Sequence, residues 1–264
     1  MRLRWTLLAV GCLVAVGIGA HFVESRLLFP APPRPAQPPA LDGSVEHTWL
    51  ETTGGRVEAF LLPAESTASG PRPLVVYAHG NGELVDSWLG EFEPLRSEGV
   101  SVLLVEYPGY GRSSGSPSER SIQGALAAGY DWAREKPLVD PDRIVGYGRS
   151  LGGGAICALG RVRSLAALVL ESTFTSIRDI AADRFGVPGF LVQNGFENLA
   201  FVSHYTSPVL LIHGVDDPLV PAVQARRLAD AAPAAELDLE KCGHGCSGQW
   251  PLILSFLGRH GLLH

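Results

Sequence analysis

Short apolar runs recur along this 264-residue chain, and each of them ends in a glycine-rich or polar segment. Stretches of helical character separate the runs. Continuous apolar strands that alternate with helices are typical of a parallel sheet covered on both faces. The runs occupy residues 74–78, 100–105, 144–145, 168–170 and 209–212. Because such sheets bind ligands at the carboxyl ends of their strands, we expect the functional residues directly after these runs.

The remaining elements complete an α/β arrangement. Residues 48–52 and 57–61 predict an antiparallel hairpin that turns at Gly54-Gly55. Further elements are expected as helices at 87–98, 118–134 (with Ser118 as N-cap), 222–231 and 247–259, and as a strand at 236–240. The sequence therefore predicts a mostly parallel sheet with an N-terminal antiparallel hairpin and helices on both faces.

The most informative motif is Gly148-Arg149-Ser150-Leu151-Gly152, which follows an apolar strand and precedes small, helix-compatible residues. This is the nucleophile-elbow pattern. A serine lifted out of a sheet needs a sharp, strained turn, and the flanking positions have room only for glycine. With 31 glycines in the chain, the pattern alone is weak evidence. Other loops must supply the partners of Ser150.

Two backbone amides are candidates for an oxyanion hole. The amide of Leu151 follows the nucleophile, and a second donor must come from another loop. The segment His79-Gly80-Asn81-Gly82 leaves the first apolar strand, and the amide of Asn81 is the preferred second donor. An ordinary tight turn is the alternative interpretation of this segment.

The base and the acid are expected in the chain order serine, acid, histidine. His244 lies between two glycines after the last predicted strand, and we assign it as the base. Asp217, directly before Pro218, is the preferred acid, with Asp216 as runner-up and Glu171 as a third candidate. The rival histidines are His79, His204, His213, His260 and His264.

Taken together, these motifs resemble the α/β-hydrolase superfamily. The matching segments are His79-Gly80-Asn81-Gly82, residues 107–111, residues 148–152, residues 171–175, residues 213–221 and Gly243-His244. Within the superfamily the chain looks like the membrane-anchored BEM46-like branch, which includes the eukaryotic ABHD13 and ABHD17 type enzymes. The resemblance covers roughly residues 45 to 264, and its H-G-x-x-D-x-x-V-P pattern favours Asp217 as the acid. Cys246 departs from it, because many such hydrolases have a polar residue soon after the histidine.

The segment between Glu171 and Pro208 is too short for a large lid domain. It contains several phenylalanines, which fits a short helical segment that offers an apolar wall to an acyl chain. Ordinary core packing is the alternative for at least half of these aromatic side chains.

The N-terminal part divides into two predicted segments before a catalytic domain at 44–264. Residues 5–23 are almost continuously apolar and just long enough to span a bilayer. We expect residues 1–26 to be a retained anchor with the domain outside the cytoplasm, because Arg2 and Arg4 precede the apolar run. The alternative is a signal peptide cleaved near Ile18-Gly19-Ala20, which would release a secreted protein. Residues 27–43 are proline-rich and predict a stiff spacer, or an ordered strap on the domain for their first few residues.

Net charge and cysteine content bear on which partners and metals the protein could bind. A net charge of −6 without a basic stripe argues against nucleic acid as a partner. Cys242 and Cys246 bracket His244, and free thiols are the default interpretation, with a local disulfide as the alternative. A zinc site is conceivable there, but no second cysteine pair would complete it. We therefore expect no metal and no organic cofactor. The oligomeric state is left open.

The function predicted from the sequence is that of a serine hydrolase acting on carboxylic esters or thioesters of a small-molecule or lipid-like acyl substrate. Ser150 would be the nucleophile, His244 the base and Asp217 the acid. A serine peptidase of the same fold and a non-catalytic binding protein are the alternatives.

Overall fold

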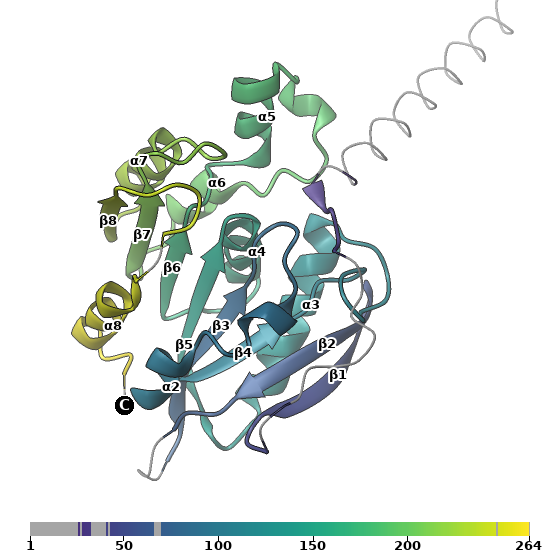
Figure 1. Cartoon of the computed structure of the whole chain (residues 1–264), viewed down its shortest axis with the longest axis vertical. Coiled ribbons are helices and arrows are strands. Elements are labelled where there is room, and N and C mark those ends of the chain that lie inside the picture. Colours follow the sequence, from purple (N-terminus) through teal and green to yellow (C-terminus); the bar gives the residue numbers. More distant parts are fainter. Residues whose placement is uncertain are drawn as a thin grey trace, which may run out of the picture.

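The computed structural model describes residues 26, 28–32, 41, 43–65, 70–246 and 248–263. In this part of the chain eight strands form one sheet in the order β1-β2-β4-β3-β5-β6-β7-β8 (Figure 1). The strands are β1 (Glu46–Thr52), β2 (Gly55–Leu62), β3 (Arg72–Ala78), β4 (Ser101–Val105), β5 (Val139–Arg149), β6 (Ala167–Glu171), β7 (Val209–Gly214) and β8 (Ala235–Glu240). β1 and β2 pair antiparallel, as do β2 and β4, and every pair from β4 to β8 is parallel. The predicted fold class is confirmed.

Helices cover both faces of this sheet. They are η1 (Val85–Trp88), α2 (Glu93–Ser97), α3 (Glu119–Arg134), α4 (Leu151–Gly160), α5 (Ile177–Phe185), η2 (Gly189–Leu191), α6 (Asn198–Val202), α7 (Val223–Ala231) and α8 (Trp250–Arg259). One core packs α2 and α8 against the sheet, and the other packs α3, α4, α6 and α7 against the opposite face. Because side chains alternate along a strand, neighbouring residues of one strand supply the two cores.

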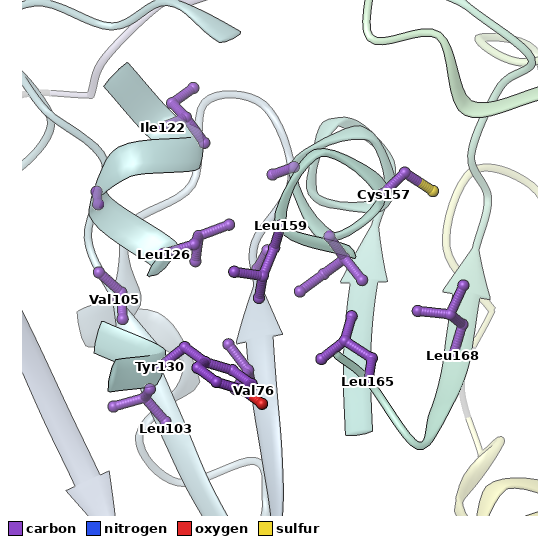
Figure 2. Packing of buried hydrophobic residues seen from close by; sticks show 14 of the residues in the cluster. Val76, Leu103, Val105, Ile122, Leu126, Tyr130, Cys157, Leu159, Leu165 and Leu168 are labelled. Atoms are coloured by element: carbon purple, nitrogen blue, oxygen red, sulfur yellow. The ribbon is translucent and has the colours of Figure 1, made fainter. Parts of the chain in front are cut away.

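The helix α3 illustrates how the sequence produces this packing. Ser118 caps it, since its hydroxyl accepts the N–H of Ser121 and the Ser121 hydroxyl accepts the N–H of Ser118. The helix then places Ile122, Leu126 and Tyr130 on the sheet, where they meet strand residues such as Val76, Leu103 and Val105 (Figure 2). The predicted N-cap is confirmed.

Two predicted helix boundaries are wrong. Residues 87–98 form no continuous helix but two short pieces, η1 and α2, because Gly90 disfavours a helix and Pro94 sits in the first turn of a new one. The last helix begins at Trp250 rather than at 247, because Gly248 has a positive φ of 85° that an α-helix does not accommodate.

The segment between β6 and β7 carries α5, η2 and α6, and no large lid domain is present there. The helix α5 projects from the body of the molecule (Figure 1) and has no buried residue. Gly186 ends it in the left-handed conformation.

Residues 28–32 lie against the domain, and we call them the N-terminal strap. Phe29 is buried, and its ring contacts that of Phe196 with a centroid separation of 6.5 Å. The first residues of the predicted spacer are thus an ordered strap rather than a free linker. The predicted membrane segment at 5–23 and the proline-rich residues 33–40 lie outside the described residues. None of the helices within the described ranges combines the length and the apolar composition that a bilayer crossing requires.

Candidate active site

Four parallel strands bring the predicted site residues to one edge of the sheet. Asn81 follows β3, Ser150 follows β5, Asp217 follows β7 and His244 follows β8. In the sheet, β3 lies between β4 and β5, so the chain adds β4 on one side of β3 and then β5 on its other side. The strand order therefore reverses at β3 and β5, beside the nucleophile. Such switch points are where open α/β sheets bind ligands.

Ser150 has the strained backbone expected of an elbow, with φ 54° and ψ −117°. Neighbouring segments hold it there. Its N–H donates to the carbonyl of Glu171 at 2.8 Å, and its own carbonyl accepts the hydroxyl of Thr173 at 2.8 Å. A non-glycine residue with positive φ persists only where its surroundings over-determine it, which is typical of active sites.

The flanking glycines of the elbow are required by close backbone approach. A Cβ on Gly148 would overlap the carbonyl of Gly152, and a Cβ on Gly152 would overlap the carbonyl oxygen of Ala78. Backbone atoms cannot yield as a flexible side chain would, so neither position has room for alanine.

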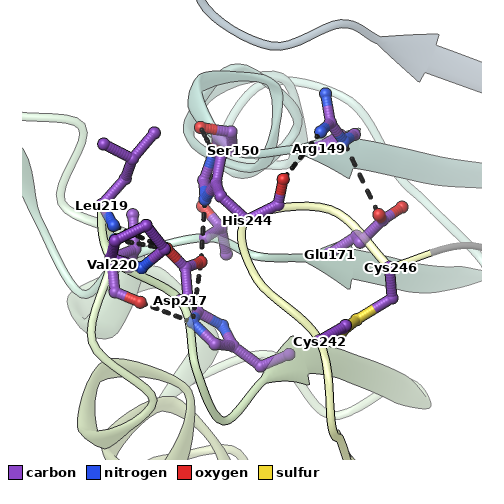
Figure 3. A network of polar contacts seen from close by, with 12 residues as sticks. Arg149, Ser150, Glu171, Asp217, Leu219, Val220, Cys242, His244 and Cys246 are labelled. Atoms are coloured by element: carbon purple, nitrogen blue, oxygen red, sulfur yellow. Dashed lines mark hydrogen bonds and ion pairs between the residues drawn. A yellow bond between two sulfur atoms is a disulfide. The ribbon is translucent and has the colours of Figure 1, made fainter.

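The imidazole of His244 joins the serine to the carboxylate (Figure 3). Its Nε2 lies 2.9 Å from the Ser150 Oγ, and its Nδ1 lies 2.8 Å from the Asp217 Oδ2. The side chain of Asp217 is fully buried, whereas that of His244 is 16% exposed. This is the geometry in which a neutral imidazole accepts a proton from serine while the carboxylate fixes its tautomer.

The other carboxylates considered from the sequence lie elsewhere. Asp216 is exposed to solvent. Glu171 is buried, but its carboxylate accepts the hydroxyl of Tyr147 at 2.6 Å and lies 3.6 Å from the Arg149 Nε. Burial raises the pKa of Glu171, an effect that Tyr147 and Arg149 partly oppose.

The rival histidines have other partners. His79 is buried against Glu106, at 2.9 Å between Nε2 and Oε1. His204 is exposed, and His260 lies near Glu236. His264 lies outside the described residues.

His213 was a rival base in the sequence, and the structure places it behind the acid. Its Nε2 lies 2.8 Å from the carbonyl of Val220 and 3.4 Å from the Asp217 Oδ2. Burial lowers the pKa of His213. The Nε2–H of His213 therefore donates to the Val220 carbonyl, and the ring lies beside the same Asp217 oxygen that faces His244.

Asp217 is also held by its own loop. Its Oδ1 accepts the N–H groups of Leu219 at 2.8 Å and Val220 at 2.9 Å. The Asp-Pro pair that precedes these residues is the sequence signal for such an Asx-type turn. One carboxylate oxygen is occupied by the turn, which leaves the other for the histidine.

The proposed oxyanion donors lie beside the serine. Asn81 and Leu151 line the same cavity as Ser150 and His244. Leu151 is the first residue of α4, so its N–H has no partner within the helix. The α4 dipole adds positive potential at this end.

Glu83 and Arg149 also belong to the site, although no motif in the sequence predicted them there. The Glu83 carboxylate accepts the N–H of Gly80 at 2.9 Å and forms an ion pair with the guanidinium of Arg149. Arg149 in turn donates to the carbonyl of His244 at 3.3 Å. This pair ties the loop of Asn81 to the loop of His244. The only signal in the sequence was an arginine inside the elbow motif.

Cys242 and Cys246 form a disulfide across the histidine loop (Figure 3), so the default prediction of free thiols is wrong. Their Cα atoms lie 5.5 Å apart, within the range of a disulfide. Glu240 lies close to both sulfur atoms. Disulfide sulfurs are not thiolates, however, so this cluster lacks the ligands that zinc prefers.

Cys157 is a free, buried cysteine, and burial raises the pKa of its thiol to about 12.

A cavity of about 290 Å³ opens beside the serine. Its polar lining residues are Asn81, Glu83, Arg149, Ser150 and His244. Its apolar wall consists of Leu28, Leu151, Phe174, Ile177, Ile180, Leu219 and Val220. The predicted apolar wall therefore includes α5, but also a strap residue that the sequence did not indicate.

Comparisons with known proteins agree with this architecture. The sequence model of the α/β-hydrolase fold matches residues 73–191. The uncharacterized protein Rv2307c of Mycobacterium tuberculosis is 32% identical over 231 residues, which cover 85% of this chain and 81% of that protein. The chain belongs to the α/β-hydrolase superfamily.

Two further similar proteins have lower sequence identity to this chain. The α/β-hydrolase domain-containing protein WAV2 of Arabidopsis thaliana is 26% identical, over 85% of this chain and 80% of that protein. An esterase of Pyrococcus furiosus superposes with a TM-score of 0.69 at 19% identity, over 88% of this chain and 97% of that one. At that identity the likeness shows the fold alone. None of these matches tests the BEM46-like branch.

Proposed function

We propose that the protein is a serine hydrolase that cleaves carboxylic esters or thioesters of apolar acyl groups. The observation that carries the proposal is the continuous contact from Ser150 through His244 to Asp217, at 2.9 Å and 2.8 Å. The strained serine at the end of a parallel strand supports it further.

In the proposed reaction His244 takes the hydroxyl proton as the Ser150 Oγ attacks the carbonyl carbon. The negative charge on the carbonyl oxygen is stabilised by the N–H groups of Asn81 and Leu151. As the intermediate collapses, the imidazolium gives its proton to the leaving alcohol or thiol, and an acyl-enzyme remains. Water then repeats the sequence with His244 as base and releases the acid. Asp217 stabilises the imidazolium in both halves.

The apolar acyl group is proposed from the cavity. Phe174, Ile177 and Ile180 offer an apolar surface next to the serine, and burying an acyl chain contributes roughly 0.8 kcal/mol per methylene.

We further propose that the chain belongs to the BEM46-like branch and that residues 1–26 anchor it to a membrane, with the catalytic domain extracytoplasmic. Signal cleavage and secretion remain the alternative.

The test compares Ser150→Ala with Ser97→Ala, an exposed serine away from the site. Turnover of p-nitrophenyl acetate, butyrate and palmitate and of the matching thioesters is measured, together with labelling by a fluorophosphonate. Ser150→Ala should lose roughly 10³-fold or more in kcat and all labelling, while Ser97→Ala retains both. Undiminished labelling of Ser150→Ala would refute the assignment. If the fluorophosphonate does not label the wild-type protein, a non-catalytic binding protein is favoured. If peptide substrates are cleaved faster than the esters and thioesters, a peptidase is favoured.

A further inference from the structure

We propose that the surface around the pocket mouth docks on a lipid bilayer, so that the acyl substrate enters the pocket from the membrane. The substrate source rests on the proposed hydrolase activity, and the choice of a bilayer as the partner rests on the proposed N-terminal anchor. We call the docking surface the apolar rim, and it consists of Phe185, Phe190, Leu191 and Leu219.

The apolar rim is unusual for a surface in contact with water. The side chains of Phe185 and Phe190 are 75% and 86% exposed, and Leu219 is 60% exposed. Among the described residues, every exposed large hydrophobic side chain except Val162 falls between residues 185 and 223. Single exposed apolar residues need no explanation. Here, however, η2, which carries Phe190 and Leu191, packs against α5, which ends at Phe185, so the exposed side chains belong to one part of the surface. Such a group of exposed apolar side chains indicates an interaction surface.

The apolar rim borders the cavity of the candidate active site. The helix that ends at Phe185 also presents Ile177 and Ile180 to the cavity, and Leu219 lines it directly. Arg184 donates to the carbonyl of Pro218, which holds the end of α5 against the loop of Leu219. A bilayer that covered the apolar rim would therefore also meet the pocket mouth.

The chain itself indicates which partner covers this surface. Leu28 in the N-terminal strap lines the same cavity, and the apolar run of the sequence ends at Val23. Five residues span at most roughly 18 Å when fully extended. If residues 5–23 lie in a bilayer, the pocket mouth cannot be farther than this from the end of the membrane segment. Phenylalanine and leucine are also the residues that interfacial segments bury at the headgroup boundary.

Docking is tested on the full chain in lipid nanodiscs. A Cys12→Ser background carries Phe190→Cys or, as matched control, Val162→Cys, each labelled with bimane. Cys157 is buried, and Cys242 and Cys246 are bridged, so the introduced thiol is the one that reacts. Brominated phosphatidylcholine should quench the label at 190 at least roughly twofold more than the label at 162. Equal quenching at both positions would overturn the proposal. It would also be overturned if protection of the label at 190 from solvent depended on the number of protein copies per nanodisc, because another copy of the chain would then cover the surface.

An activity measurement separates docking from the chemistry. Phe185→Ser with Phe190→Ser is compared with Val162→Ser on p-nitrophenyl palmitate in nanodiscs and on p-nitrophenyl butyrate in solution. The double variant should lose roughly tenfold on palmitate with butyrate turnover unchanged, because less apolar surface holds the domain on the bilayer. Equal rates of the two variants on palmitate contradict the proposal. Absence of all turnover in wild type would refute the proposed function, while the quenching result would still decide the docking.

Discussion

Asp216 and Asp217 are neighbours in the chain, yet Asp216 faces solvent while Asp217 is buried behind the imidazole of His244. The distinction arises from the turn after β7. It pairs one oxygen of Asp217 with the amides of Leu219 and Val220 and directs the other oxygen to His244. The two adjacent aspartates therefore provide a test with a matched control.

Asp217→Asn should lower kcat roughly 10³- to 10⁴-fold, because the amide leaves the histidine without the charge that stabilises the imidazolium and fixes its tautomer. Asp216→Asn should stay close to wild type. Steady-state kinetics on p-nitrophenyl butyrate measure both. Equal losses in the two variants would show that the buried carboxylate has no special role.

Glu83→Gln should lower kcat by roughly tenfold or more while the KM for a short ester changes little, because a small misplacement of the catalytic groups is costly. The amide cannot form the ion pair with Arg149, which loosens the connection between the loops of Asn81 and His244. Glu91→Gln is the control, since Glu91 is an exposed side chain of the same region. A loss confined to the melting temperature would mean that the pair is only structural.

Gly152→Ala should destabilise the fold by about 3 kcal/mol or prevent folding, because the new methyl group meets the backbone of Ala78. Gly90→Ala adds a methyl group where no atom lies within 4 Å, and should change stability by less than about 0.5 kcal/mol. Urea unfolding compares the two variants. A stable Gly152→Ala protein would show that the backbone of Ala78 can move away from the elbow.

Reduction of the Cys242–Cys246 disulfide should lower both stability and kcat. The bridge closes a short loop around His244, and the chain-entropy model gives about 2 kcal/mol for a loop of this length. The double variant Cys242→Ser with Cys246→Ser should behave like the reduced enzyme and should no longer respond to dithiothreitol. Cys157→Ala, which removes the buried thiol, should respond to dithiothreitol as wild type does.

The pH dependence of stability should reveal His79. Burial alone would lower its pKa, but the adjacent Glu106 carboxylate raises it above the ordinary value of 6.5. A raised folded-state pKa means that protonation favours the fold. This contribution is complete below pH 6.5 and is lost as the pH rises through the folded-state pKa.

The difference in free energy of unfolding between wild type and His79→Gln should therefore narrow as the pH is raised above 6.5. Urea titrations at several pH values measure it. His204→Gln, which replaces an exposed histidine, should show no such trend. If this difference in free energy of unfolding instead grew as the pH rose, the folded-state pKa of His79 would have to be lowered and not raised.

The fold and the positions of Ser150 and His244 could be predicted from the sequence because each rests on a local pattern, whereas Asp217 was preferred to Asp216 on the family resemblance. Apolar runs gave the strands, the bracketed serine gave the elbow, and glycines around His244 gave the last loop. The Arg149–Glu83 pair and the position of His213 behind Asp217 depend on tertiary contacts between separate loops, which no local pattern encodes. The default prediction of free thiols at Cys242 and Cys246 was wrong because spacing alone does not distinguish a disulfide from two thiols. The two helix predictions at 87–98 and 247–259 were wrong because Gly90, Pro94 and Gly248 interrupt helices that the apolar periodicity alone would extend.

The N-terminal strap decides how far the chain can be trimmed without changing selectivity. A recombinant form that began at residue 44 would retain Ser150, His244 and Asp217 but lose Leu28 from the cavity wall and Phe29 from its contact with Phe196. A leader peptidase that cut after Ala20 would leave the strap in the mature protein. Anchored and secreted forms would thus share the same cavity wall, and only the shortened form would lack Leu28 from it.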